Sequence, residues 1–138
     1  MNEPTIEAVE ALHFDPAKVP PRWRSDGAPP SGIAPADEDI RLYHLRHNEV
    51  VHAIAAHLAG ELENLLAQRP TTRYVRLWPH KIGVVINLHK RYQNPGQAVT
   101  VYLRKMGLRL SRLERHRNKD NETCYYVPIE ALREVLGI

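Results

Sequence analysis

Apolar positions recur at steps of three and four residues between Ile40 and Ala67, and no proline interrupts this stretch. Such spacing places apolar side chains on one stripe of an α-helix. An acidic run at residues 37–39 precedes it and suits the positive end of a helix dipole. The pattern predicts one long helix over residues 37–68. Its stripe is formed by Tyr43, Val50, Val51, Ile54, Leu58, Leu62 and Leu65.

This stripe needs an apolar cover. A helix of about 28 residues spans roughly 40 Å, more than the width of a compact domain of about 70 residues. Two arrangements satisfy the pattern. The stripe can pack within the chain, or part of it can pair with a second copy in a homodimer.

The pattern changes after Arg69. Residues 74–77 alternate as a short strand, and a helix is expected from Pro79 to about Tyr92. His89 falls in the apolar register of this helix, which predicts a core or half-buried histidine with a hydrogen-bond partner.

A second helix is expected from Pro95 to Met106, with Asn94 as its N-cap and Gly107 as its end. Residues 108–117 and 122–127 are strand-like, and the polar tetrapeptide 118–121 suits a hairpin turn between them. A short helix over 129–136, ended by Gly137, closes the chain.

The first 36 residues form a proline-rich, acidic arm that we expect to be largely unstructured. Trp23 in this arm either anchors it on its own domain or binds a partner. The expected organisation is an arm (1–36), a long helix (37–68) and a basic domain (69–138). The prolines are Pro4, Pro16, Pro20, Pro21, Pro29, Pro30 and Pro35.

The order helix, strand, helix, turn, helix, hairpin resembles the winged helix-turn-helix DNA-binding superfamily. The matching stretches are the helix at 80–92, the turn at 93–96, the helix at 97–107 ending in Arg-Lys-Met-Gly, and the basic hairpin. The resemblance implies a mainly α fold with a small β-hairpin (α+β), preceded here by the long helix and the arm. It also implies nucleic-acid binding and specifies no finer function.

Charge is divided unevenly along the chain. Residues 1–68 hold five Lys and Arg against eleven Asp and Glu, a net −6, whereas residues 69–138 hold fourteen against five, a net +9. A basic half of this kind concentrates a polyanion such as nucleic acid, although it also suits an acidic protein or a membrane surface.

The helix at 95–106 carries the candidate base contacts. An apolar face of Val99, Tyr102, Leu103 and Met106 is expected to pack inward, so the opposite face is left for solvent or DNA. Glutamine can bond adenine, arginine can bond guanine, and threonine or valine methyls can meet a thymine methyl. The alternative is an ordinary solvated helix face. The outward residues are Gln97, Thr100, Val101 and Arg104.

Further cations surround this helix and are expected to bind phosphates. On the hairpin, the alternative is a charged edge that prevents strand aggregation. The hairpin set is Arg109, Arg112, Arg115, Arg117 and Lys119; Lys105, Lys81, Lys90 and Arg91 extend it, and Asn94 can bind a phosphate at the helix N-terminus.

The sequence gives little support for disulfide, metal or catalytic chemistry. The single cysteine, Cys124, allows no intramolecular disulfide and fits a reducing compartment. The eight histidines show no metal-ligand spacing with acidic partners, and no phosphate loop or nucleophile motif occurs. We therefore expect no cofactor, no metal, no membrane segment and no enzymatic activity, in a cytoplasmic protein that is nucleoid-associated if bacterial.

Two functions follow from the sequence. The first is a sequence-specific double-stranded DNA-binding protein, a transcriptional regulator or an accessory factor of a mobile element, acting as a homodimer. The second is a non-catalytic adaptor subunit of a larger nucleoprotein assembly, in which the winged helix and the acidic arm contact proteins.

Overall fold

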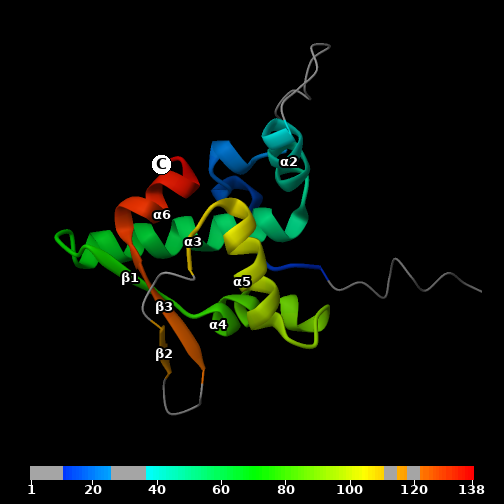
Figure 1. Ribbon diagram of the computed structural model, residues 1–138. Coiled ribbons are helices and arrows are strands. Elements are labelled where there is room, and N and C mark those ends of the chain that lie inside the picture. Colours follow the sequence, from blue (N-terminus) through cyan, green and yellow to red (C-terminus); the bar gives the residue numbers. More distant parts are fainter. Residues whose placement is uncertain (1–10, 26–36, 111–114, 118–121) are drawn as a thin grey trace, which may run out of the picture.

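The computed structural model describes residues 11–25, 37–110, 115–117 and 122–138. It is mainly helical with a small antiparallel sheet, which confirms the α+β class (Figure 1). None of the described helices is long and apolar enough to cross a membrane. The elements in order are η1 (Pro16–Lys18), η2 (Pro21–Trp23), α2 (Asp37–Arg46), α3 (Glu49–Gln68), β1 (Tyr74–Leu77), α4 (Pro79–Val85), η3 (Leu88–Lys90), α5 (Pro95–Met106), β2 (Arg115–Arg117), β3 (Thr123–Pro128) and α6 (Ile129–Leu136).

The expectation of one long helix over 37–68 is wrong, because the chain turns between α2 and α3. Asn48 adopts an extended conformation at this turn, with φ −99° and ψ 121°. Its side-chain oxygen accepts hydrogen bonds from the backbone N–H of Val50 (2.8 Å) and of Val51 (3.4 Å). Asn48 is therefore the N-cap of α3, a role that asparagine fills well. In Figure 1, α2 stands steeply against α3.

Helix α3 lies at the centre of the molecule. Its side chains Ile54, Leu58 and Leu62 are at most 2% exposed. The helix contacts η1, η2, α2, α5 and α6, so several elements share in covering it. The apolar stripe is thus largely used within the chain and no longer argues for pairing with a second copy. The homodimer itself stays a prediction.

The expectation of an unstructured arm is wrong for residues 11–25. Trp23 is completely buried, and its indole Nε1 donates a 2.7 Å hydrogen bond to the carbonyl of Val135 in α6. Val19 and Leu12 are buried in the same core. Trp23 therefore anchors the arm on its own domain, the first of its two proposed roles.

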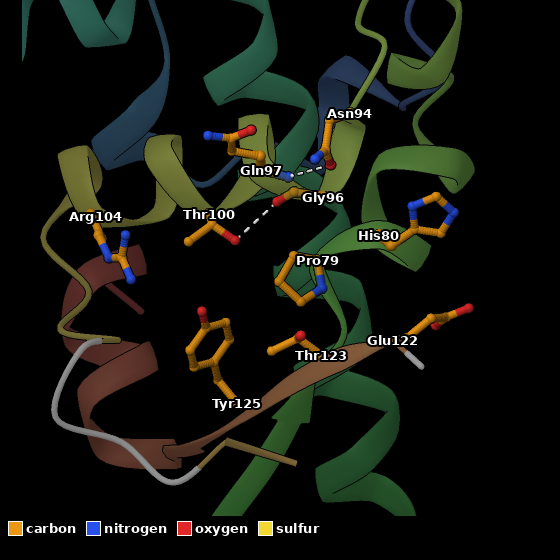
Figure 2. A pocket seen from close by; sticks show the side chains of 10 residues that line it. All are labelled: Pro79, His80, Asn94, Gly96, Gln97, Thr100, Arg104, Glu122, Thr123 and Tyr125. Atoms are coloured by element: carbon orange, nitrogen blue, oxygen red, sulfur yellow. Dashed lines mark hydrogen bonds between the residues drawn. The ribbon is translucent and has the colours of Figure 1, made fainter. Parts of the chain in front are cut away.

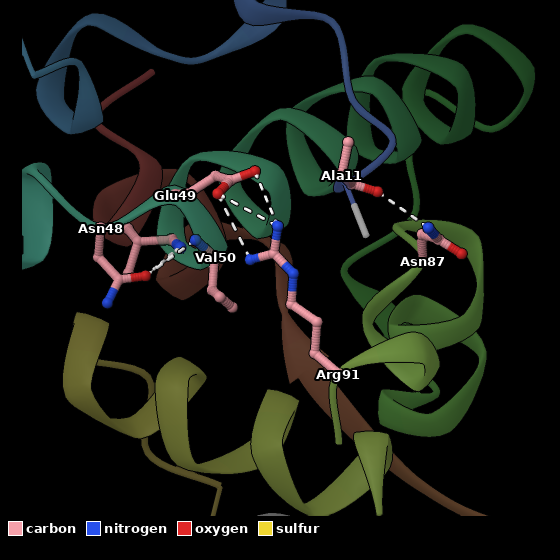
Figure 3. Close-up of polar contacts among 7 residues, drawn as sticks. Ala11, Asn48, Glu49, Val50, Asn87 and Arg91 are labelled. Atoms are coloured by element: carbon pink, nitrogen blue, oxygen red, sulfur yellow. Dashed lines mark hydrogen bonds and ion pairs between the residues drawn. The ribbon is translucent and has the colours of Figure 1, made fainter. Parts of the chain in front are cut away.

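The arm also holds the corner that follows α4. The backbone N–H of His13 donates to the carbonyl of Ile86 at 2.9 Å. The side-chain amide of Asn87 donates to the carbonyl of Ala11 at 2.9 Å (Figure 3). Asn87 is buried, and its backbone is in the left-handed region, with φ 69°. The arm therefore bonds the corner at a residue whose backbone conformation is uncommon for residues other than glycine.

Two substitutions at Asn87 should separate the cost of its left-handed backbone from the loss of its hydrogen bond to Ala11. Asn87→Ala should lower the free energy of unfolding by about 2 kcal/mol, because alanine is disfavoured in the left-handed region and the hydrogen bond to Ala11 is lost. Asn87→Gly loses the bond without the strain and should cost about 1 kcal/mol. Urea unfolding of both variants measures the difference. Equal losses would show that backbone strain at this corner is negligible.

The helix expected from Pro79 to Tyr92 is shorter than predicted. Helix α4 ends at Val85, and η3 follows the left-handed Asn87. His89 lies in η3 and is exposed, so its expected place in an apolar core is wrong. The break shifts the helical register, which turns His89 away from the interior.

The sheet has the strand order β1-β3-β2, with both neighbouring pairs antiparallel. Val75 is paired with Val127, and His116 with Cys124. The described part of the expected strand 108–117 is limited to β2, because residues 108–110 are not in a strand, although Leu108 and Leu110 are buried. The sheet thus joins the strand before α4 to the hairpin after α5.

Candidate nucleic-acid interface

Helix α5 is fixed at both ends by the residues predicted for that role. The Asn94 side-chain oxygen accepts a 3.1 Å hydrogen bond from the backbone N–H of Gln97, and Pro95 occupies the first turn. Gly107 ends the helix with φ 116°, a conformation that favours glycine. The boundaries 95–106 are confirmed.

The inward face of α5 packs closely on α4. Val99, Leu103 and Met106 are at most 3% exposed. The two helices approach most tightly at Gly83, where an added Cβ would lie 2.8 Å from the Cβ of Pro95. This contact sets the position of the α5 N-terminus, because no larger residue fits there without moving a helix.

Support also comes from the side of α5 that faces α3. The Asn48 side-chain amide donates a hydrogen bond to the Tyr102 hydroxyl at 3.4 Å. Burial raises the pKa of the neighbouring Tyr92 hydroxyl, and a hydrogen bond with Tyr102 raises it further. With its pKa raised, the Tyr92 hydroxyl stays protonated at neutral pH and remains a hydrogen-bonding group behind α5.

The outward face of α5 borders an open groove of about 640 Å³ between this helix, the start of α4 and β3 (Figure 2). Three of the four predicted base-contacting residues line it: Gln97, Thr100 and Arg104. Val101 is 40% exposed and is not among the lining residues. The Thr100 hydroxyl donates to the Gly96 carbonyl at 2.9 Å, so its oxygen remains able to accept from a ligand. In Figure 2, Arg104 and Thr100 point toward β3, whereas the Gln97 amide points away from it.

The opposite wall contains residues that the sequence did not identify. Thr123 and Tyr125 lie two positions apart on β3, as residues on one face of a strand do. The Tyr125 hydroxyl points toward Thr100 and Arg104 in Figure 2. Glu122 and His80 complete this side of the groove. The sequence shows that alternate residues of β3 share a face. Which of its two faces meets α5 depends on the order of the strands in the sheet.

Several predicted cations lie outside this groove. The Arg91 guanidinium is 3.4 Å from the carboxylate of Glu49 at the start of α3 (Figure 3), so Arg91 is engaged in an ion pair rather than in the basic surface expected for it. The Lys81 ammonium lies 4.9 Å from the centre of the Trp78 ring, on another side of α4. Lys105 stacks on Tyr102 at 5.4 Å. Lys90 and Arg109 are exposed.

The hairpin cations are placed only in part. Arg115 and Arg117 belong to β2, and their register partners on β3 are Tyr125 and Thr123, both of which line the groove. Arg112 and Lys119 lie outside the described residues. The backbone therefore brings two of the predicted arginines to the strand next to the groove.

Within the described parts of the chain, no group of three or more His, Cys, Asp or Glu side chains is arranged to hold a metal ion. No family model, curated protein or solved structure matches this chain.

Proposed function

We propose that the chain is a sequence-specific double-stranded DNA-binding protein whose helix α5 enters the major groove. One observation carries the proposal: Gln97, Thr100 and Arg104 border the same open groove on a helix that is capped at both ends and buried along its opposite side. A helix held in this way presents polar side chains in a fixed arrangement. B-DNA has a major groove about 12 Å wide, which admits an α-helix.

The surrounding topology supports a winged helix-turn-helix arrangement. The order α3, β1, α4, α5, β2, β3, with β1 and β2 on either side of β3, places a hairpin next to the second helix of a tightly packed pair. In helix-turn-helix proteins this second helix contacts base edges through its N-terminal part. Gln97 and Thr100 occupy that part of α5, and Arg104 lies one turn further on.

The charges support nucleic acid with one local exception. The net +9 of residues 69–138 attracts phosphates, and Arg109 with the β2 arginines brings charge to the hairpin side. Glu122 is an acid in the groove itself. A carboxylate there repels phosphate but accepts a hydrogen bond from the cytosine N4 amine, which favours base contact over backbone contact at this end.

The proposal is tested by selecting preferred duplexes from a random pool and measuring affinity across a salt series. We expect an enriched motif, and log affinity should fall steeply and linearly with log salt concentration. Failure to bind any duplex at low salt would overturn the proposal in favour of the adaptor function.

The hairpin arginines should act on all sequences alike. Arg112→Ala or Arg115→Ala should weaken selected and random duplexes equally, because phosphate contacts carry no sequence information. Each lost contact should make the plot of log affinity against log salt shallower by about 0.9. Arg133→Ala on α6, with the same charge change, is the matched control. Equal slopes for all three variants would assign the hairpin charges to solubility or to a protein partner.

A further inference from the structure

We propose a second binding surface at the outer edge of β1, where an extended peptide with apolar and acidic residues adds as a fourth strand and places an apolar side chain in the cleft between β1, α3 and α4. This surface is separate from the α5 groove. Strand β1 is at one edge of the sheet and the hairpin strand β2 at the other, and the residues that line the cleft are not among those that line the α5 groove.

The backbone of β1 offers unused hydrogen-bonding groups. The Arg73 carbonyl accepts from the Ile129 N–H at 2.9 Å, so residues 73, 75 and 77 direct their polar groups toward β3. Tyr74 and Arg76 therefore direct theirs outward. The Tyr74 carbonyl accepts from the Thr72 hydroxyl at 3.2 Å. No other described residue bonds the Tyr74 N–H or the backbone N–H and carbonyl of Arg76, and such an edge is a template for another strand.

An apolar cleft of about 290 Å³ runs along this edge. Val75, Arg76 and Leu77 all border the cleft. Successive side chains of a strand point to opposite faces of the sheet, so a cleft that touches all three lies along the edge of the strand. Its other walls come from α3 and α4. Val85 in α4 is 54% exposed, which is high for a large aliphatic side chain. The apolar lining is completed by Leu58, Trp78 and Ile82.

The rim charges favour acidic residues in the peptide. Arg76 lies 5.0 Å from the centre of the Tyr126 ring, and Lys81 lies 4.9 Å from that of Trp78, so both cations are supported by aromatic faces while remaining exposed. No ion pair between described residues involves either of them. On the α3 side, the Glu61 carboxylate lies 3.5 Å from His57, and burial lowers the pKa of His57. Glu61 therefore keeps its negative charge at neutral pH, and we expect the acidic residues of the peptide at the Arg76 and Lys81 rim.

A second copy of the chain fits this edge less well. Antiparallel pairing of β1 with its own copy would place Arg76 opposite Arg76 in one of the registers open to the outward edge. Like charges across neighbouring strands are destabilising. Charge complementarity therefore selects an acidic peptide.

The probe is a fluorescein-labelled heptapeptide of alternating glutamate and valine, titrated with the full chain and followed by fluorescence anisotropy. Tyr74→Pro removes an outward N–H without breaking the pairing with β3, whereas Tyr74→Ala keeps this donor. We expect Tyr74→Pro to bind about tenfold more weakly than Tyr74→Ala. A peptide with lysine in place of glutamate should not bind.

Two measurements do not depend on the folding of a variant. N-methylation of alternate peptide amides removes donors from one edge of the ligand and should abolish its binding to the unaltered chain. Hydrogen exchange should show new protection at the Tyr74 and Arg76 amides when the glutamate peptide is bound. Unchanged exchange at these amides, equal affinity of the N-methylated peptide, or protection that grows with protein concentration without peptide would each overturn the proposal, the last in favour of self-association.

Discussion

Trp23→Ala should lower the free energy of unfolding by about 3–5 kcal/mol, the usual cost of truncating a fully buried tryptophan. The indole fills the space between the arm and α6, and the Val135 carbonyl also loses its donor. A loss of this size is a large part of the stability of a small domain. Urea unfolding followed by circular dichroism measures it.

Two variants control this experiment. Trp23→Phe keeps much of the apolar volume but not the N–H, so its loss should be smaller than that of alanine. Tyr74→Ala removes an aromatic side chain that is 57% exposed and should change stability by less than about 0.5 kcal/mol. If Trp23→Ala changes the free energy of unfolding as little as Tyr74→Ala, the burial of Trp23 does not stabilise the domain.

Gln97→Ala and Arg104→Ala should each weaken binding to the selected duplex by about 1–3 kcal/mol while leaving random DNA nearly unaffected. This follows from the proposed function, because base contacts discriminate between sequences. Competition of labelled selected duplex against random duplex measures the ratio directly. Arg133→Ala, on α6, should leave that ratio unchanged.

The outcome for Arg104 separates two kinds of contact. Arg104 lines the groove and points toward β3, so it can bond a base or a phosphate. If Arg104→Ala weakens random and selected duplexes equally, it binds phosphate, and base contact is left to Gln97 and Thr100. If neither variant changes the ratio, α5 does not contact base edges and the proposal for this helix fails.

Local signals in the sequence were sufficient for α5 and α6. Asn94, Pro95 and Gly107 act through bonds and backbone preferences within a few residues of themselves, so the limits of α5 followed from their order. The inward face of α5 followed from its 3.6-residue period. Hence Gln97, Thr100 and Arg104 were identified without a structure. Gly137 ended α6 for the same kind of reason.

The residues that interrupt the helices, Asn48 and Asn87, are present in the sequence, but the longer apolar pattern around each of them predicted a continuous helix. The apolar stripe continues on both sides of Asn48, from Tyr43 to Val50, so its period does not show the interruption. The structure shows it in the extended backbone of Asn48 and in its side-chain bonds to Val50 and Val51. Asparagine is also tolerated inside helices. Asn48 therefore acts as an N-cap only if the packing of α2 in another direction stabilises the chain more than a continuous helix would. The break after α4 is similar, because the left-handed conformation of Asn87 is held by its bond to Ala11, 76 positions away.

The sequence alone determined the limits of α5 and α6, the division of charge and the polar face of α5, since each depends on neighbouring residues or on composition. Only the tertiary structure decided that the arm is part of the core, that Arg91 is bound by Glu49, and that Thr123 and Tyr125 face α5. Each of these depends on contacts between residues far apart in the chain. A proline-rich segment with few apolar residues cannot form a core by itself, but it can complete one that α3 and α6 have already built.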